Sequence, residues 1–278
     1  MSILEEDFVL TNGVAIPKIG FGTWKVPTDV APQAVVDALD VGYRHIDTAR
    51  VYRNEEGVGQ GLQASSVPRD QVFVTTKVPS AIKTADEIDE CITESLRRLA
   101  TDHIDLLLIH APKPYPPLPG DDQKTYFEEN AAVWSAMEKA YRQGLLRSIG
   151  VSNFEIADLD YLLSHCDIPP MVNQIEWHIG FRQDDLTSYC QARDILVEAY
   201  SPIGTGKLLG NEHIAAVAGR CGVTVPQLCV RYALQHGCLP LPKTVHREFM
   251  VQDAAIDFVI SDDDMTALDA IDLGSADD

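Results

Sequence analysis

The sequence lacks a long apolar run, and its first residues lack the order of a secretion signal. No apolar run approaches the ~20 residues that a membrane-spanning helix needs. The chain starts Met-Ser-Ile-Leu-Glu-Glu-Asp, without a basic region followed by an apolar one. We therefore expect a cytoplasmic protein that makes no contact with a membrane.

Paired cysteines and clustered histidines are also missing. The six cysteines lie far apart and form no C-x-x-C pair, which argues against a zinc site and against a disulfide framework. None of the eight histidines is spaced from another histidine or an acid as metal ligands are. We expect reduced thiols and no metal. The cysteines are Cys91, Cys166, Cys190, Cys221, Cys229 and Cys238.

Basic residues are scarce, with 22 Lys and Arg against 42 Asp and Glu and a formal net charge of −20. A nucleic acid needs a basic face that displaces its counterions, so we expect no nucleic-acid partner. Such an acidic surface is also typical of proteins from a very salty cytoplasm, where salt screens self-repulsion. A steep rise of the melting temperature with added KCl would separate this halophilic hypothesis from an ordinary acidic protein.

Short apolar runs alternate with amphipathic segments along the chain. Segments 85–100 and 128–143 have helical spacing of apolar residues, and the runs between such segments resemble buried parallel strands. Eight strands alternating with helices predict one α/β domain, a (β/α)8 (TIM) barrel over residues 1–278, with a doubly wound sheet as the second choice. The predicted strands are 19–24, 44–49, 72–78, 104–110, 148–152, 171–176, 196–200 and 239–242.

The stretch 42–59 reads as a buried strand, a loop and then a helix that begins at Asn54 as a cap. Asp47 is at the carboxyl end of this strand, and Tyr52 is on the loop beyond it. A carboxylate and a phenol can therefore face one cavity. An Asp that caps a turn under a packed Tyr is the plainer interpretation of this spacing alone.

Two further strand ends favour a catalytic site. Lys77 lies in an otherwise apolar strand and needs a buried partner, which Asp47 can supply, and His110 ends the next strand. In a barrel these ends converge. An ammonium beside Tyr52 is expected to lower its pKa below the usual value of about 10, and a neutral His110 could donate a hydrogen bond to a carbonyl oxygen. A structural ion pair and a buried core histidine are the alternatives.

The chain resembles the aldo-keto reductases, most of all the compact bacterial branch with the 2,5-diketogluconate reductases. The likeness runs from Asn-Gly-Val-Ala-Ile-Pro at 12–17, through Gly-Tyr-Arg-His-Ile-Asp-Thr-Ala at 42–49, to Leu-Pro-Lys-Thr at 241–244. It implies reduction of aldehydes, ketones or keto-sugars by NADPH. It also implies that Tyr52 is the general acid, that Lys77 and Asp47 tune it, and that His110 orients the carbonyl.

The resemblance also assigns a cofactor site, since no Gly-x-Gly-x-x-Gly fingerprint opens a helix after a strand. It places the nicotinamide amide at Ser152, Asn153 and Gln174 and the ring on Tyr200, although Ser152 and Asn153 could instead cap a helix. A loop from 201 to 208 would hold the diphosphate and the segment 243–249 the adenosine phosphate. The implied residues of these two segments are Ser201, Pro202, Ile203, Thr205, Leu208, Lys243, Thr244, Val245, His246 and Phe249.

Two positions depart from the family pattern. Phe249 stands where relatives selective for NADPH carry an arginine, so we expect a weaker preference for NADPH and some use of NADH. Ala111 follows the catalytic histidine where the family commonly has Trp, which predicts a wide substrate pocket. We expect Trp24, Ala111, Tyr115 and Trp177 to line that pocket.

Three functions stay open at this point, with a monomeric reductase of small carbonyl compounds as the main expectation. A barrel isomerase or hydrolase could use Asp47 and His110 without nicotinamide, but it would have no need of Asn153, Gln174 and Tyr200 together. A non-catalytic subunit that senses the cofactor would bind NADPH and reduce nothing. The intact set of four residues favours turnover.

Overall fold

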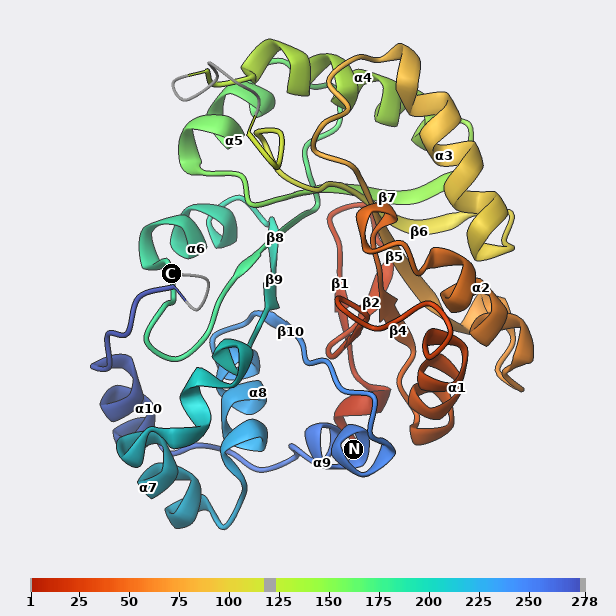
Figure 1. The fold of residues 1–278 in the computed structure, drawn as a ribbon. Coiled ribbons are helices and arrows are strands. Elements are labelled where there is room, and N and C mark those ends of the chain that lie inside the picture. Colours follow the sequence, from red (N-terminus) through yellow and green to blue (C-terminus); the bar gives the residue numbers. More distant parts are fainter. Residues whose placement is uncertain (1, 118–123, 276–278) are drawn as a thin grey trace.

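The protein is a parallel barrel surrounded by helices, as the computed structural model shows for residues 2–117 and 124–275 (Figure 1). Within these residues eight parallel strands neighbour one another in chain order from β3 to β10. The N–H groups of Gly20 and Gly22 donate to the carbonyl oxygens of Pro240 (3.1 Å) and Pro242 (3.0 Å), which joins the two edges. The predicted (β/α)8 barrel is confirmed, and the doubly wound sheet is wrong.

The elements alternate as the sequence pattern predicts. The strands are β1 (Asp7–Val9), β2 (Ala15–Pro17), β3 (Phe21–Gly22), β4 (His45–Asp47), β5 (Phe73–Val78), β6 (Ile104–Ile109), β7 (Leu146–Ser152), β8 (Val172–Glu176), β9 (Leu196–Tyr200) and β10 (Leu239–Leu241). The α-helices are α1 (Ala31–Val41), α2 (Glu55–Ala64), α3 (Asp86–Leu99), α4 (Phe127–Arg142), α5 (Ile156–Leu163), α6 (Asp184–Gln191), α7 (Glu212–Cys221), α8 (Val225–Gln235), α9 (Arg247–Ala254) and α10 (Asp262–Asp269). The 3₁₀ helices are η1 (Ile3–Glu5), η2 (Arg50–Tyr52), η3 (Arg69–Gln71) and η4 (Gly204–Gly210). No helix in these described parts is both long and apolar enough to cross a membrane.

The barrel strands are short and apolar because both of their faces are covered. Every residue of β5 and of β6 is buried, one side facing the barrel interior and the other the helices. The helix α3 covers this layer with Ile88, Cys91, Ile92 and Leu99. The apolar side chains therefore form the core. The few polar side chains buried in these strands are the candidates for a functional role.

An antiparallel hairpin of β1 and β2, which the sequence reading did not predict, closes the amino end of the barrel. Phe8 pairs with Ile16 in this hairpin. Leu10 and Ile16 are buried in the same apolar cluster as Ile104 and Leu146, which begin β6 and β7. The Nδ2 atom of Asn12 donates to the carbonyl oxygen of Arg147 (2.9 Å). The opposite end of the barrel is thus the end available to a ligand.

Two glycines of helix α2 lie where neighbouring backbone comes too close for a Cβ atom. A Cβ at Gly57 would lie 2.3 Å from the carbonyl oxygen of Thr28, and a Cβ at Gly59 would lie 2.4 Å from that of Arg98. Asn54 is the N-cap residue, but its side chain does not cap the helix as predicted. Its Nδ2 donates to the carbonyl oxygens of Thr23 (2.8 Å) and Val26 (3.0 Å), so it ties the first barrel loop to the second.

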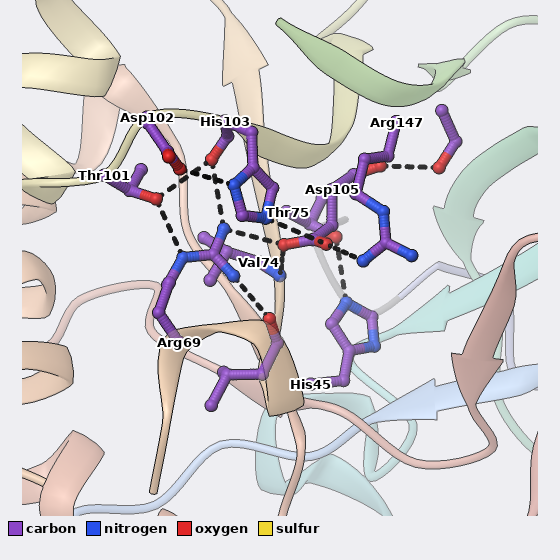
Figure 2. Close-up of polar contacts among 11 residues, drawn as sticks. His45, Arg69, Val74, Thr75, Thr101, Asp102, His103, Asp105 and Arg147 are labelled. Atoms are coloured by element: carbon purple, nitrogen blue, oxygen red, sulfur yellow. Dashed lines mark hydrogen bonds and ion pairs between the residues drawn. The ribbon is translucent and has the colours of Figure 1, made fainter. Parts of the chain in front are cut away.

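A buried carboxylate cluster ties three strands together away from the cavity described below (Figure 2). The Oδ2 atom of Asp105 accepts from Arg69 Nη2 (2.7 Å) and from the N–H of Val74 (2.9 Å). Its Oδ1 atom accepts from Arg147 Nη1 (2.7 Å). Removing one partner of such a buried ion pair costs about 3–5 kcal/mol. We therefore assign this cluster to stability.

Candidate active site

A cavity of about 800 Å³ opens at the carboxyl ends of the barrel strands, where active sites of such barrels lie. Its walls come from the ends of β3, β4, β6, β7, β9 and β10 and the loops after them, from Gln174 within β8, and from α8 and α9. The lining residues are Gly22, Trp24, Lys25, Asp47, Tyr52, His110, Ser152, Asn153, Gln174, Tyr200, Ser201, Pro202, Ile203, Thr205, Gly206, Leu209, Pro226, Leu241, Pro242, Lys243, Thr244, Phe249, Gln252 and Asp253.

The structure brings the four predicted catalytic residues to one end of this cavity. Lys77 is fully buried on β5, and its Nζ donates to Asp47 Oδ1 (2.8 Å), Asp47 Oδ2 (2.7 Å) and the carbonyl oxygen of Thr48 (2.8 Å). Burial is the largest single effect on the pKa of Lys77 and lowers it, but the charge and hydrogen bond of Asp47, together with smaller effects of neighbouring acidic groups, outweigh burial and the pKa is raised. Lys77 is therefore a permanent positive charge under the cavity.

Tyr52 and His110 face each other above this ion pair. Their ring centres are 5.6 Å apart, and Lys77 Nζ lies 5.1 Å from the centre of the Tyr52 ring. Burial, helped by the charge of Lys77, lowers the pKa of His110 to about 3, so the imidazole is neutral near pH 7. This neutral state is the one expected from the sequence.

The expected direction of the Tyr52 pKa was wrong. Burial raises this pKa above its usual value, and the opposing effect of the Lys77 ammonium is smaller. A charge in the barrel stabilises the phenolate, but the loss of water around the phenol destabilises it more. Tyr52 is thus a neutral phenol near pH 7, which is the form that can give a proton.

The polar residues predicted to hold an amide lie beside this group. Ser152 Oγ donates to the carbonyl oxygen of Gln174 (2.8 Å), and Asn153 Nδ2 donates to the carbonyl oxygen of His110 (3.0 Å). Tyr200 donates through its hydroxyl to Asn153 Oδ1 (2.9 Å). Helix α5 begins after Glu155, so Ser152 and Asn153 do not cap it. All four residues line the cavity.

The loop after β9 lines the cavity with Ser201, Pro202, Ile203 and Thr205, as predicted. Leu208 does not belong to this wall, because it is buried in the core, and the exposed Leu209 faces the cavity instead. Thr205 and Gly206 have φ angles of 50° and 96°, so the 3₁₀ turn η4 is broken there. Sequence order alone does not reveal which of the two leucines turns inward after such a break.

The segment after β10 forms the far end of the cavity. Lys243, Thr244 and Phe249 line it, whereas Val245 and His246 do not. Val245 packs against the apolar cluster below, and the exposed His246 ring lies against Phe249. No charged side chain stands at position 249, so the ring offers a stacking face alone.

The predicted substrate pocket is only partly formed by the residues named for it. Trp24 lines the cavity, but Ala111, Tyr115 and Trp177 do not. Tyr115 is 83% exposed. Trp177 is buried among helices, where it contacts Tyr232 and its Nε1 donates to Thr187 Oγ1 (3.2 Å). Side chains alternate along a strand, and Gln174 faces the cavity, so the third residue beyond it faces the helices.

The cavity residues that the sequence did not identify include Lys25, Pro226, Gln252 and Asp253. Asp253 is buried, and burial raises its pKa to about 7. Lys25 lies over the ring of Trp24, with its Nζ 3.9 Å from a ring centre. Lys25 and Lys243 form no ion pair with any residue that the structure describes. Two unpaired ammonium groups in so acidic a chain suit the phosphates of a dinucleotide.

Comparison with known proteins agrees with this geometry. The model of the Aldo/keto reductase family matches residues 18–273. A glyoxal reductase of Bacillus subtilis is 39% identical over 270 residues, which cover 96% of this chain and 93% of the relative. An aldo/keto reductase of Brucella melitensis has a similar crystal structure, with a TM-score of 0.89 and 35% identity over 96% of this chain and 98% of that one. An aldo-keto reductase of Bombyx mori in complex with NADP has a TM-score of 0.86 and 34% identity over 95% of this chain and 92% of its own.

Proposed function

This chain belongs to the aldo/keto reductase family and is an NADP-dependent oxidoreductase of carbonyl compounds, and we propose that Asp47, Tyr52, Lys77 and His110 carry its reaction. The observation that carries the proposal is the convergence of these four side chains at one end of the cavity. Tyr52 and His110 face that cavity, and the buried ion pair of Lys77 and Asp47 lies beneath them.

The residues that we assign to the cofactor line the same cavity. Bound NADPH supplies a hydride to the carbonyl carbon. We propose that Ser152, Asn153 and Gln174 hold the nicotinamide amide, that Tyr200 lies against the ring, and that Lys25 and Lys243 bind phosphate. These six residues come from five different barrel strands or the loops that follow them, which fixes both ends of a long ligand.

Side chains of the protein bind and protonate the carbonyl oxygen of the substrate. Neutral His110 donates a hydrogen bond to the carbonyl oxygen, which polarises the C=O bond. As the carbon accepts the hydride, the oxygen takes the proton of the Tyr52 hydroxyl and an alcohol forms. The phenolate left behind is stabilised by Lys77 until it regains a proton from solvent. The reverse reaction needs the phenolate and is favoured by alkaline pH.

We propose small aldehydes and α-dicarbonyl compounds as the substrates. The B. subtilis relative is named for its reduction of glyoxal, and the cavity carries aromatic rings beside two hydrogen-bond donors. The test is a panel of glyoxal, methylglyoxal, simple aldehydes, ketones and keto-sugars with NADPH. Small dicarbonyls should give the highest kcat/KM. Equal or higher values for bulky ketones would contradict the substrate class while leaving the reductase assignment intact.

Phe249 should make this enzyme less selective for NADPH than a relative with arginine there. We expect the ratio of kcat/KM for NADPH over NADH to stay below about a thousandfold, which is ~4 kcal/mol. Phe249→Arg should raise that ratio by about tenfold or more, because a charged hydrogen bond to the 2′-phosphate contributes about 1.5–3 kcal/mol. An unchanged ratio would place the 2′-phosphate away from position 249.

Cellular location and assembly stay predictions. We propose that the protein acts as a monomer in the cytoplasm, in line with its free cysteines and its low content of basic residues. Light scattering of the purified protein at several concentrations tests the monomer, and a mass that doubles with concentration would contradict it.

A further inference from the structure

Glu198 is a carboxyl group in the barrel interior that the reaction described above does not use. It lies in the middle of β9 and is fully buried. The side chains around it come from β4, β5 and β8, and the neighbouring β10 adds only the apolar Leu239 and Leu241 together with Pro240. A buried carboxyl group without a cation beside it is rare in proteins, and it calls for a reason.

The two oxygen atoms of Glu198 have different partners. Its Oε2 accepts from Gln174 Nε2 (2.7 Å). Its Oε1 has no hydrogen-bond partner among the described residues, and the nearest ring nitrogen is His45 Nε2 at 3.9 Å. The Nε2 atom of His45 is already paired with Thr75 Oγ1 (2.9 Å), a contact that Figure 2 includes.

The charges around Glu198 favour its neutral form. Among the described residues Lys77 is the only full positive charge near Glu198, and it gives all three of its hydrogens to Asp47 and Thr48. Burial, helped by Lys77, lowers the pKa of His45 to about 3, so that ring is neutral. Burial and the negative charge of Asp47 raise the pKa of Glu198 to about 8. The interior then holds one carboxylate, one ammonium and one neutral acid.

Glu198 also determines the orientation of the Gln174 side-chain amide. The two hydrogens of Gln174 Nε2 go to Asp47 Oδ2 (2.9 Å) and Glu198 Oε2 (2.7 Å). With its nitrogen directed at these two carboxyl oxygens, the amide of Gln174 has its NH₂ group pointing into the barrel. The remaining Oε1 of Gln174 is left for the cavity that this residue lines, where it can accept from an amide NH₂.

We propose that Glu198 is a positioning residue of this site, which turns Gln174 toward the cofactor amide and, when it loses its proton, favours the oxidised over the reduced cofactor. The inference rests on the proposed function, because Gln174 is assigned there to the nicotinamide. The nicotinamide of NADP⁺ is positive and that of NADPH is neutral. A second carboxylate behind Gln174 therefore attracts only the oxidised form.

The test compares the affinities of NADP⁺ and NADPH, measured by quenching of protein fluorescence from about pH 6.5 to about pH 9. In the native protein the affinity for NADP⁺ relative to NADPH should rise by about tenfold, with its midpoint at or below about pH 8. Using the ratio removes the titration of the phosphates, which the two cofactors share. In Glu198→Gln, which keeps the acceptor for Gln174 and cannot ionise, the ratio should be flat.

Glu55→Gln is the matched control. Glu55 is equally buried and also has one carboxyl oxygen without a hydrogen-bond partner among the described residues, but it lies on α2 outside the cavity. This variant should keep the native pH dependence. The inference is overturned if Glu198→Gln shows the same rise as the native protein, while native turnover of carbonyls would still support the proposed function.

A second measurement needs no variant. With ¹³C in the glutamate carboxyl groups only, NMR titration of the native protein should reveal one glutamate with a midpoint near pH 8. If every glutamate titrates below about pH 6, Glu198 is charged near neutrality and the inference is wrong.

Discussion

Replacing Tyr52 by phenylalanine should lower kcat/KM for aldehyde reduction by about 10³-fold, because a positioned general acid contributes about 10²–10⁴-fold. The change removes one hydroxyl group and keeps the ring that faces His110. Binding of NADPH, followed by fluorescence quenching, should change little. The native enzyme should keep its proton donor into the alkaline range, since burial raises the pKa of Tyr52 above its usual value.

Tyr141→Phe is the control for this substitution. The Tyr141 hydroxyl lies 3.3 Å from Asn12 Nδ2, at the closed end of the barrel beside the hairpin. Loss of that hydroxyl should leave kcat/KM within about twofold of the native value. Equal losses in the two variants would mean that Tyr52 acts through stability and not through its proton.

Lys77→Met should have the second largest effect, and it should act on both activity and stability. The substitution leaves Asp47 buried without its cation, which costs about 3–5 kcal/mol of unfolding free energy. It also removes the charge that stabilises the Tyr52 phenolate, so kcat should fall by about 10²–10³-fold. Urea unfolding and steady-state kinetics measure the two losses.

The double variant Asp47→Asn with Lys77→Met separates these effects. No buried carboxylate is left uncompensated in it, so it should be more stable than Lys77→Met alone. It should be no more active, because the charge beside Tyr52 is still missing. A double variant as unstable as the single one would show that the Asp47 charge does not cause the instability.

The barrel, and the convergence of the four proposed catalytic residues at one end of its cavity, were predictable from the sequence because their signals are local. Strands covered on both faces read as continuous apolar runs, and each predicted run overlaps one barrel strand. Lys77 was found as a charge inside such a run. Once the strands are placed, the geometry of a barrel brings their carboxyl ends together, so Asp47, Lys77 and His110 follow from the fold.

Other features depend on contacts between distant parts of the chain, which the sequence pattern does not reveal. The hairpin strands β1 and β2 have three residues each, too few for a periodic signal, and the barrel end stabilises them. Which leucine of the η4 turn faces the cavity depends on the φ angles of Thr205 and Gly206. Trp177, the first residue after β8, could have been placed by continuing the alternation of side chains from Gln174, which would have put it among the helices.

The effect of burial on pKa values was the hardest feature to predict from the sequence. The sequence places a lysine near Tyr52, but it does not say how completely the phenol is buried, and burial decides the direction of its pKa. Glu198 did carry a signal, since it interrupts the apolar run of β9 as Lys77 interrupts that of β5. The similarity to NADP-bound relatives meanwhile favours a reductase over an isomerase, a hydrolase or a cofactor sensor.

The most direct measurement is a single turnover in which native protein and Tyr52→Phe, each loaded with NADPH, are mixed with glyoxal and the loss of NADPH absorbance is followed. Cofactor binding is complete before the reaction starts, so the rate reports the chemical step alone. We expect rapid oxidation in the native protein and a rate about 10³-fold lower in the variant. Equal rates would contradict proton donation by Tyr52 and with it the proposed site.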